Sequence, residues 1–307
     1  MVTPYETFLD GVRATHGEEA EPWLAHVDHL IAELSGRWEL ETGEPRRGDA
    51  DGYVVDAIRG RRQRVVLRIA YPDGWFHQQT TALSVWDGVA AVELIDHDPR
   101  GAQLLERPEP GAPLRAEPEP VRALDIAAEV AKKLWVPDPG GIDAVETEVT
   151  AWAASMDDRN ESLGEPIEEE LIEEARSALV LRSAEQRERS LLHGDLHLGN
   201  IVSAKNGRWL AVDPRPLVGE REFDAAALLT DDGPAIAARG PAGRLRLRRR
   251  LDQLVPALEC DPERLRDWAL AITVDYALWA YEAGDRDAGE AGVTVAKMLQ
   301  GLMPAAG

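Results

Sequence analysis

The segment from residue 108 to residue 120 contains five prolines and one glycine, and it divides the chain into two parts with different hydrophobic patterns. Proline fixes φ and has no backbone N–H group, so we expect neither a helix nor a strand to run through this segment. Before it, short apolar runs indicate strands, and periodic apolar residues indicate two helices. Strands are expected at 53–58, 63–70, 89–95 and 102–105, with a further strand opening at 38–41, and helices at 21–34 and 75–86.

Beyond the Pro-rich segment, apolar residues recur every three or four positions, which predicts a mainly helical part. Helices are expected at 121–135, 143–156, 167–188, 243–258, 262–283 and 286–301, interrupted by short strands at 200–202 and 209–213. The sequence therefore predicts an α+β protein with a bilobal fold. We expect a small β-rich N-lobe at residues 1–107, a linker at 108–120 and a larger helical C-lobe at 121–307.

The composition limits the partners of this chain. Its net charge is −22, from 34 basic and 56 acidic residues, which disfavours binding to nucleic acid or to anionic membranes and favours small cations. The single cysteine, Cys260, excludes an internal disulfide and a cysteine-based zinc site. No apolar run approaches the roughly 18 residues of a membrane span, and the N-terminus has no signal-peptide core, so we expect a cytoplasmic protein. The sequence gives no indication of the oligomeric state.

The candidate reaction centre is the segment His193–Asn200, which reads H-x-D-x-x-x-x-N and which we call the HGD loop. The apolar strand that follows it ends in Asp213. Phosphoryl transfer from a magnesium nucleotide requires a carboxylate that orients the attacking hydroxyl, and an amide and a second carboxylate that hold the metal. Asp195 fits the first role, and Asn200 and Asp213 supply the hard oxygen ligands that Mg²⁺ prefers.

Other interpretations of this segment remain open. His193 and His197 with nearby carboxylates could instead form the zinc or iron site of a metal hydrolase, although no third histidine lies nearby in the sequence. We expect His193 to brace the loop. Asp224 lies near the start of an apolar helix, where it could be the N-cap, could accept backbone N–H bonds from the HGD loop, or could do both.

A nucleotide would need contacts in the N-terminal part. Gly48–Gly52 lies between two predicted strands where a phosphate-covering turn would sit, but it matches neither the G-x-G-x-x-G pattern nor a Walker sequence. Arg68, on the strand at 63–70, is the candidate phosphate-binding cation. The extended segment of Leu104, Leu105, Glu106 and Arg107 is the candidate hinge that would bind adenine.

The motifs resemble those of the aminoglycoside phosphotransferases, and within them the streptomycin 6-kinase and hydroxyurea phosphotransferase branch. The resemblance spans nearly the whole chain, and the C-terminal motifs are the more specific part of it. It rests on residues 193–200, 209–220 and 223–224, and more loosely on 38–40, 94–98, 104–107, 248–252 and 277–279.

This resemblance implies a protein-kinase-like fold, ATP with Mg²⁺ as cofactors, and phosphorylation of a hydroxyl on a small, often cationic, antibiotic. It places Asp195 on the catalytic base, Asn200 and Asp213 on the metal ligands, and Arg68 where the branch has lysine. The helix at 75–86 contains no glutamate to pair with that cation. A pseudokinase-like binding protein therefore stands as the alternative to an active kinase, as does a kinase of a sugar or secondary metabolite.

A cationic acceptor would need carboxylates in its pocket. Asp275 and Glu282 are seven positions apart on one predicted helix and so share a face, and Asp231 lies in the segment after the helix that contains Asp224. Asp231, Asp275 and Glu282 are therefore the candidates for contacts with the acceptor, and the alternative is a solvated acidic face. The other acidic candidates in this part of the chain are Asp232 and Asp285.

Overall fold

The computed structural model describes residues 3–48, 52–185 and 187–302. The chain forms two compact units, Met1–Gly111 with Ser203–Leu210, and Ala112–Val202 with Ala211–Gly307. Among the residues that the structure describes, none of the helices has both the length and the apolar character that a membrane crossing demands.

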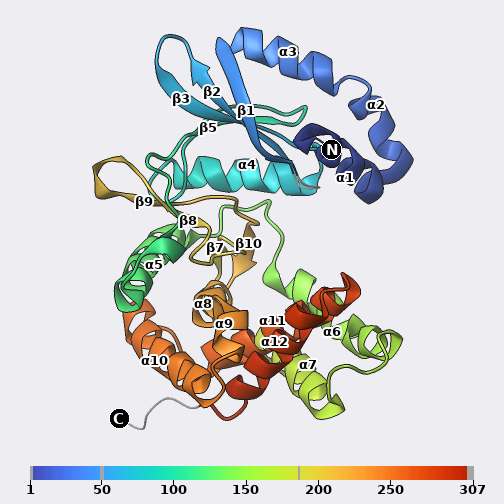
Figure 1. Ribbon diagram of the computed structural model, residues 1–307, viewed down its shortest axis with the longest axis vertical. Helices are drawn as coiled ribbons and strands as arrows, with labels where there is room; N and C mark the ends of the chain where they lie inside the picture. Colours follow the sequence, from blue (N-terminus) through green and yellow to red (C-terminus); the bar gives the residue numbers. More distant parts are fainter. Residues whose placement is uncertain (1–2, 49–51, 186, 303–307) are drawn as a thin grey trace. The chain divides into compact units, whose positions relative to one another are not determined.

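The first unit contains a five-stranded antiparallel sheet in the order β1-β2-β3-β5-β4 (Figure 1). The strands are β1 (Leu40–Gly48), β2 (Tyr53–Arg59), β3 (Gln63–Ile69), β4 (Leu94–Asp98) and β5 (Ala102–Glu106). Three helices precede the sheet, α1 (Pro4–His16), α2 (Glu21–Leu24) and α3 (Val27–Arg37), and α4 (Gly74–Trp86) follows β3. The buried side chains of Phe8, Leu34 and Trp38 join those of Leu67 and Ile69 from β3 in one core, which fixes α1 and α3 against the sheet.

Two sequence expectations for this unit are wrong. The strand expected at 89–95 is β4 at Leu94–Asp98, because Asp87 and Gly88 adopt left-handed backbone conformations that turn the chain after α4. The single helix expected at 21–34 is divided into α2 and α3 by a turn. In addition, α1 was not predicted; it begins with a capping box in which Thr3 and Glu6 bond each other's backbone N–H groups.

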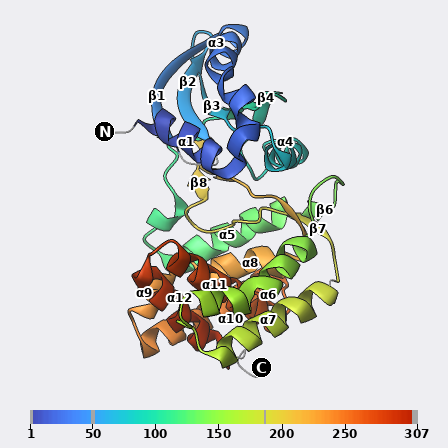
Figure 2. The same cartoon turned by 90° about the vertical axis from the view of Figure 1, so that its right-hand side faces the viewer.

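The second unit is mainly helical and is organised around α11 (Pro262–Glu282), which packs against helices from three parts of the chain, α7, α8 and α12 (Figures 1 and 2). The remaining helices are α5 (Pro120–Leu134), α6 (Val145–Ser162), α7 (Glu169–Ala184), α8 (Arg221–Thr230), α9 (Gly233–Ala237), α10 (Pro241–Leu258) and α12 (Arg286–Leu299). Short strands of this unit form a sheet in the order β10-β7-β6, and a separate two-stranded sheet pairs β8 with β9, of which residues 203 and 209–210 belong to the first unit. Their bounds are β6 (Val136–Pro137), β7 (Ser190–Leu192), β8 (Ile201–Ser203), β9 (Trp209–Ala211) and β10 (Leu217–Gly219).

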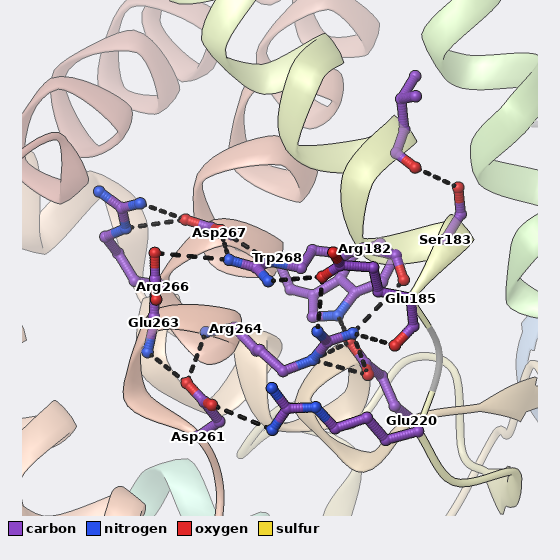
Figure 3. Close-up of polar contacts among 12 residues, drawn as sticks. Arg182, Ser183, Glu185, Glu220, Asp261, Glu263, Arg264, Arg266, Asp267 and Trp268 are labelled. Carbon is purple, nitrogen blue, oxygen red and sulfur yellow. Dashed lines mark hydrogen bonds and ion pairs between the residues drawn. The ribbon is translucent and has the colours of Figure 1, made fainter.

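A buried group of charges joins α7, α11 and the start of α8 (Figure 3). Arg264 Nη2 donates to Glu220 Oε2 at 2.6 Å, and Trp268 Nε1 donates to the same carboxylate. Arg182 Nη2 donates to Asp267 Oδ2 at 2.6 Å. Glu220 is the residue immediately before α8, so this group fixes where that helix begins.

Candidate active site

The HGD loop connects β7 to β8 and is anchored by alternating apolar side chains. Leu196 and Leu198 are buried, whereas the side chains of Asp195, His197 and Asn200 remain partly accessible. The loop thus presents its polar side chains on one side because its leucines point into the core of the second unit.

A buried carboxylate from α8 holds the start of the loop. Asp224 Oδ2 accepts a hydrogen bond from the backbone N–H of His193 at 2.8 Å, and its Oδ1 accepts one from that of Gly194 at 2.8 Å. Trp135 Nε1 donates to Asp224 Oδ2 at 3.0 Å. Asp224 therefore braces the loop, as one sequence interpretation predicts. The N-cap interpretation is wrong, because the residue at the cap of α8 is Glu220.

Burial shifts the pKa values of two neighbouring groups in opposite directions. It raises the pKa of Asp224 from 3.8 to about 6, although three N–H donors oppose the shift. It lowers the pKa of His193 from 6.5 to about 4. The raised pKa of Asp224 stabilises the fold below pH 3.8, and this contribution is lost as the pH rises through about 6. The contribution of His193 is present above pH 6.5 and is lost as the pH falls through about 4, so the two contributions oppose each other in this window.

We expect Asp224→Asn to make the protein more sensitive to acid. In the wild type, protonation of Asp224 stabilises the folded protein as the pH falls, and this offsets the destabilisation caused by His193. The variant keeps His193 but lacks this offset. Between pH 6.5 and 4 its free energy of unfolding should therefore fall by on the order of 3 kcal/mol more than that of the wild type. Urea unfolding at several pH values measures this difference. The exposed Asp158 on α6 provides a control, and parallel pH profiles for Asp224→Asn and the wild type would contradict the prediction.

Gly194 allows a close backbone approach within the loop. Its φ is +77°, and a Cβ at this position would lie 1.8 Å from the carbonyl oxygen of Arg215. The backbone N–H of Arg215 donates to His193 O at 2.8 Å, so the two segments cannot separate without losing this bond.

Gly194→Ala should therefore lower the free energy of unfolding by at least about 2 kcal/mol, through backbone strain together with steric overlap. Gly164→Ala is the matched control, because Gly164 has φ +79° and nothing within 4 Å of the added Cβ. That control should show only the cost of placing alanine in the left-handed region, about 1 kcal/mol. Equal losses for the two variants in chemical denaturation would rule out the overlap as a cause.

Three sequence-predicted residues gather at this loop. Asn200 Nδ2 donates to Asp195 Oδ2 and to Asp195 O, both at 3.0 Å. The backbone N–H of Val212 donates to Asn200 O at 2.8 Å, which brings the adjacent Asp213 beside Asn200. Because the amide nitrogen of Asn200 faces Asp195, its Oδ1 is directed elsewhere and can serve as a ligand.

Asp213 combines a strained backbone conformation with an exposed carboxylate that could bind a metal ion. It is exposed and has φ +55°, a conformation that is uncommon for residues other than glycine and that often occurs at functional sites. Within the described residues, its side chain has no hydrogen bond or ion pair. Asn200 and Asp213 thus suit a hard divalent cation that keeps several other oxygen ligands.

The described residues do not support a zinc or iron site. The described part of the chain contains no group of three or more His, Cys, Asp or Glu side chains that could hold a metal ion. His197 instead lies with Nε2 3.8 Å from Asp195 Oδ2, and its Nδ1 accepts a hydrogen bond from the N–H of Gly199 at 3.0 Å.

The predicted nucleotide-binding residues lie in the first unit, on neighbouring strands. Arg68 on β3 pairs with Gln103 on β5, and Arg68 Nη1 donates to Gln103 Oε1 at 3.4 Å. The guanidinium also lies against the backbone of Gly52, since a Cβ there would be 3.1 Å from Arg68 Nε. The other part of the predicted turn, residues 49–51, lies outside the described residues.

The predicted hinge residues lie at the end of β5 and, for Arg107, just after it. Leu104 and Leu105 are buried, whereas Glu106 pairs with Arg208 at 2.8 Å and Arg107 pairs with Asp56 at 3.0 Å.

The acidic residues predicted to contact an acceptor do not lie together. Asp231 lines a pocket of about 550 Å³ that also contains Asp195 and His197. Asp275 and Glu282 do not line this pocket; both pair with Arg159, at 2.6 and 2.7 Å.

The pocket also contains Arg115, which sequence reasoning missed because it lies inside the Pro-rich segment. Its neighbour Leu114 is fully buried, and an apolar residue between prolines is the one signal that this part of the segment is anchored.

Comparison with known proteins is consistent with this geometry. Residues 38–284 match the family described as aminoglycoside/hydroxyurea antibiotic resistance kinase. The chain is 33% identical over 288 residues to streptomycin 6-kinase of Streptomyces glaucescens, which covers 93% of each protein. It is 30% identical over 289 residues to hydroxyurea phosphotransferase of Kitasatospora aureofaciens, which covers 93% of this chain and 82% of that protein.

The fold is similar to solved kinase structures. One is a thermostable mutant of the aminoglycoside phosphotransferase APH(4)-Ia in ternary complex with AMP-PNP and hygromycin B. The two structures align with a TM-score of 0.55 and 16% sequence identity, and the alignment covers 90% of this chain and 98% of that one. The predicted protein-kinase-like α+β fold is confirmed.

Proposed function

Because this chain belongs to the family of aminoglycoside/hydroxyurea antibiotic resistance kinases, and is therefore a small-molecule phosphotransferase with an alcohol acceptor, we propose that it is an ATP- and Mg²⁺-dependent O-phosphotransferase whose acceptor is a streptomycin-like aminoglycoside or hydroxyurea. The single observation that carries the proposal is that Asn200 bonds the carboxylate of Asp195, while the backbone bond from Val212 to Asn200 brings Asp213, just after β9, beside the HGD loop. The AMP-PNP complex of the similar structure supports ATP as the donor.

Asp195 is the proposed catalytic base. Its carboxylate orients the acceptor hydroxyl and accepts the proton as the new bond forms between the acceptor oxygen and the γ-phosphorus. The bond from the γ-phosphorus to the β–γ bridging oxygen breaks, and ADP leaves. The hydrogen bond from Asn200 Nδ2 holds one Asp195 oxygen in place, so the other oxygen is available to the hydroxyl.

Asn200 and Asp213 are the proposed magnesium ligands. The metal, when bound, would neutralise charge on the phosphate oxygens. Asn200 would offer Oδ1, since its Nδ2 bonds Asp195, and the exposed Asp213 would offer its carboxylate.

Arg68 is proposed to contact phosphate oxygens, and Leu104, Leu105, Glu106 and Arg107 to form the adenine-binding hinge. The N-lobe at 1–107 would thus bind the nucleotide, and the part beyond the linker at 108–120, residues 121–307, would supply the catalytic groups and the acceptor pocket. A guanidinium can bond phosphate through two N–H groups, which is why Arg68 can replace a lysine in this role.

A coupled assay of nucleotide consumption tests the proposal, with streptomycin, other aminoglycosides, hydroxyurea and simple sugars as acceptors. We expect magnesium-dependent consumption of ATP that requires one of these acceptors, with formation of a phosphorylated product. Nucleotide binding without acceptor-dependent consumption would instead favour a pseudokinase-like binding protein, the alternative that Arg68 motivates. Turnover with sugars alone would indicate a kinase of a different metabolite.

A further inference from the structure

The pocket that contains Asp195 has few groups that could bind a highly charged acceptor. It lies among α8, α9, α11 and α12 and beside the HGD loop, within the second unit. Its walls are formed largely by small or apolar side chains and by the ring of Tyr276. Those residues include Ala227, Pro234, Ile272, Gly292 and Val295.

Three carboxylates line the pocket, and one of them is already paired. Arg115 Nη2 donates to Asp231 Oδ1 at 3.2 Å, and the Asp231 side chain is only 3% exposed. The backbone of Asp231 is held as well, because Arg250 Nη1 donates to its carbonyl oxygen at 2.6 Å. Asp231 therefore cannot turn outward to meet a ligand without breaking this arrangement.

Arg115 is itself fixed in the wall, although its side chain is 55% exposed. Its backbone N–H donates to Leu198 O at 3.0 Å, which ties it to the HGD loop. Its Nη2 also lies 3.5 Å from His197 Nδ1. The guanidinium thus occupies the space between Asp231 and the loop, where it places a positive charge next to the pocket.

The two other carboxylates of the pocket offer a cationic acceptor little negative charge that is not already engaged. Asp195 is engaged by the acceptor hydroxyl in the proposed reaction, so Asp232 is the only other carboxylate among the residues lining the pocket, and it lies 4.0 Å from Arg246. Asp275 and Glu282 are paired with Arg159 outside the pocket.

We propose that Arg115 is a specificity-determining residue, which by neutralising Asp231 selects neutral or singly charged hydroxyl compounds and disfavours polycationic acceptors. The inference rests on the proposed function and narrows it. Because Arg115 already pairs with Asp231, a cationic acceptor gains little attraction from that carboxylate, whereas a neutral acceptor can use the N–H groups of Arg115 as hydrogen-bond donors. Of the two acceptor types, hydroxyurea is neutral and streptomycin is a polycation, so the inference favours an acceptor with the charge of hydroxyurea.

Arg115→Gln tests this, because it removes the charge, keeps a polar side chain and releases the carboxylate of Asp231. We expect the KM for streptomycin, and its Kd in nucleotide-free calorimetry, to fall about tenfold, and the KM for hydroxyurea to change by less than about twofold. Arg115→Lys should behave as the wild type. Arg122→Gln, which removes an exposed arginine on α5 that pairs with Glu117, is the matched control and should change neither acceptor.

Equal shifts for both acceptors, or no shift in the Kd of streptomycin, would overturn the inference. If Arg115→Gln does not fold, Asp231→Asn provides a second test. It removes the carboxylate that pairs with Arg115, so the positive charge of Arg115 remains without its counter-charge, and the Kd for streptomycin should rise about tenfold. Calorimetry also separates the two proposals. If no acceptor is phosphorylated by the wild type, the proposed function fails, but the charge preference of the pocket is still measured.

Discussion

Asp195→Asn should reduce kcat for phosphoryl transfer by at least about a thousandfold while leaving the Kd for nucleotide nearly unchanged. The amide has the same shape as the carboxylate and can still accept the bond from Asn200 Nδ2, so the loop should keep its conformation. It cannot accept the proton of the acceptor hydroxyl, and it attracts the Nε2 of His197, now 3.8 Å from Asp195, less strongly. The loss should therefore be found in the chemical step.

Single-turnover kinetics with saturating acceptor, together with nucleotide titration, measures the two effects separately. Asp158→Asn removes an exposed carboxylate from α6 in the same unit and should leave kcat within about twofold. If Asp195→Asn retains kcat within about tenfold of the wild type, Asp195 is not the base, and the role proposed for the HGD loop fails with it.

The sequence was most informative where one local pattern determines the structure. Strands are predicted at 53–58 and 63–70, and the structure has β2 and β3 there on either side of a turn at residues 60–62. Strong helical periodicity likewise predicts α5, α10 and α11 to within a few residues. The position of β4 could not be predicted in this way, because it depends on the left-handed conformations of Asp87 and Gly88. A sequence shows that glycine permits such a conformation but not that the chain adopts it.

Partners far apart in the sequence account for the other differences. Asp275 and Glu282 do share a helix face, as their spacing predicts, but that face meets Arg159 from α6 and not the pocket of Asp195. Periodicity assigns a face to a side chain and does not identify the residue opposite. Arg115 lies in the Pro-rich segment, where no periodicity assigns a face, and its partner Asp231 is 116 residues away in the sequence.

Arg264→Met should lower the free energy of unfolding by about 3–5 kcal/mol, the largest effect on stability that we expect from a single side chain. The Arg264 side chain is 1% exposed and that of Glu220 is 3% exposed, so the substitution leaves a buried carboxylate without its counter-charge (Figure 3). Burial already raises the pKa of Glu220, and Arg264 opposes this shift, so the unpaired carboxylate should titrate at a higher pH in the variant. Urea unfolding at neutral pH measures the loss in stability.

A double variant identifies the cause. Glu220→Gln removes the negative charge but keeps an oxygen that can accept the hydrogen bond from Trp268 Nε1. Arg264→Met combined with Glu220→Gln should therefore recover at least half of the stability lost in Arg264→Met. Arg286→Met is the surface control, because Arg286 and Glu290 form an ion pair whose side chains are 83% and 60% exposed, and its loss should cost less than about 1 kcal/mol. If Arg264→Met is no more destabilising than this control, the buried pair does not fix the start of α8, and Asp224 must be held in place by the packing of that helix alone.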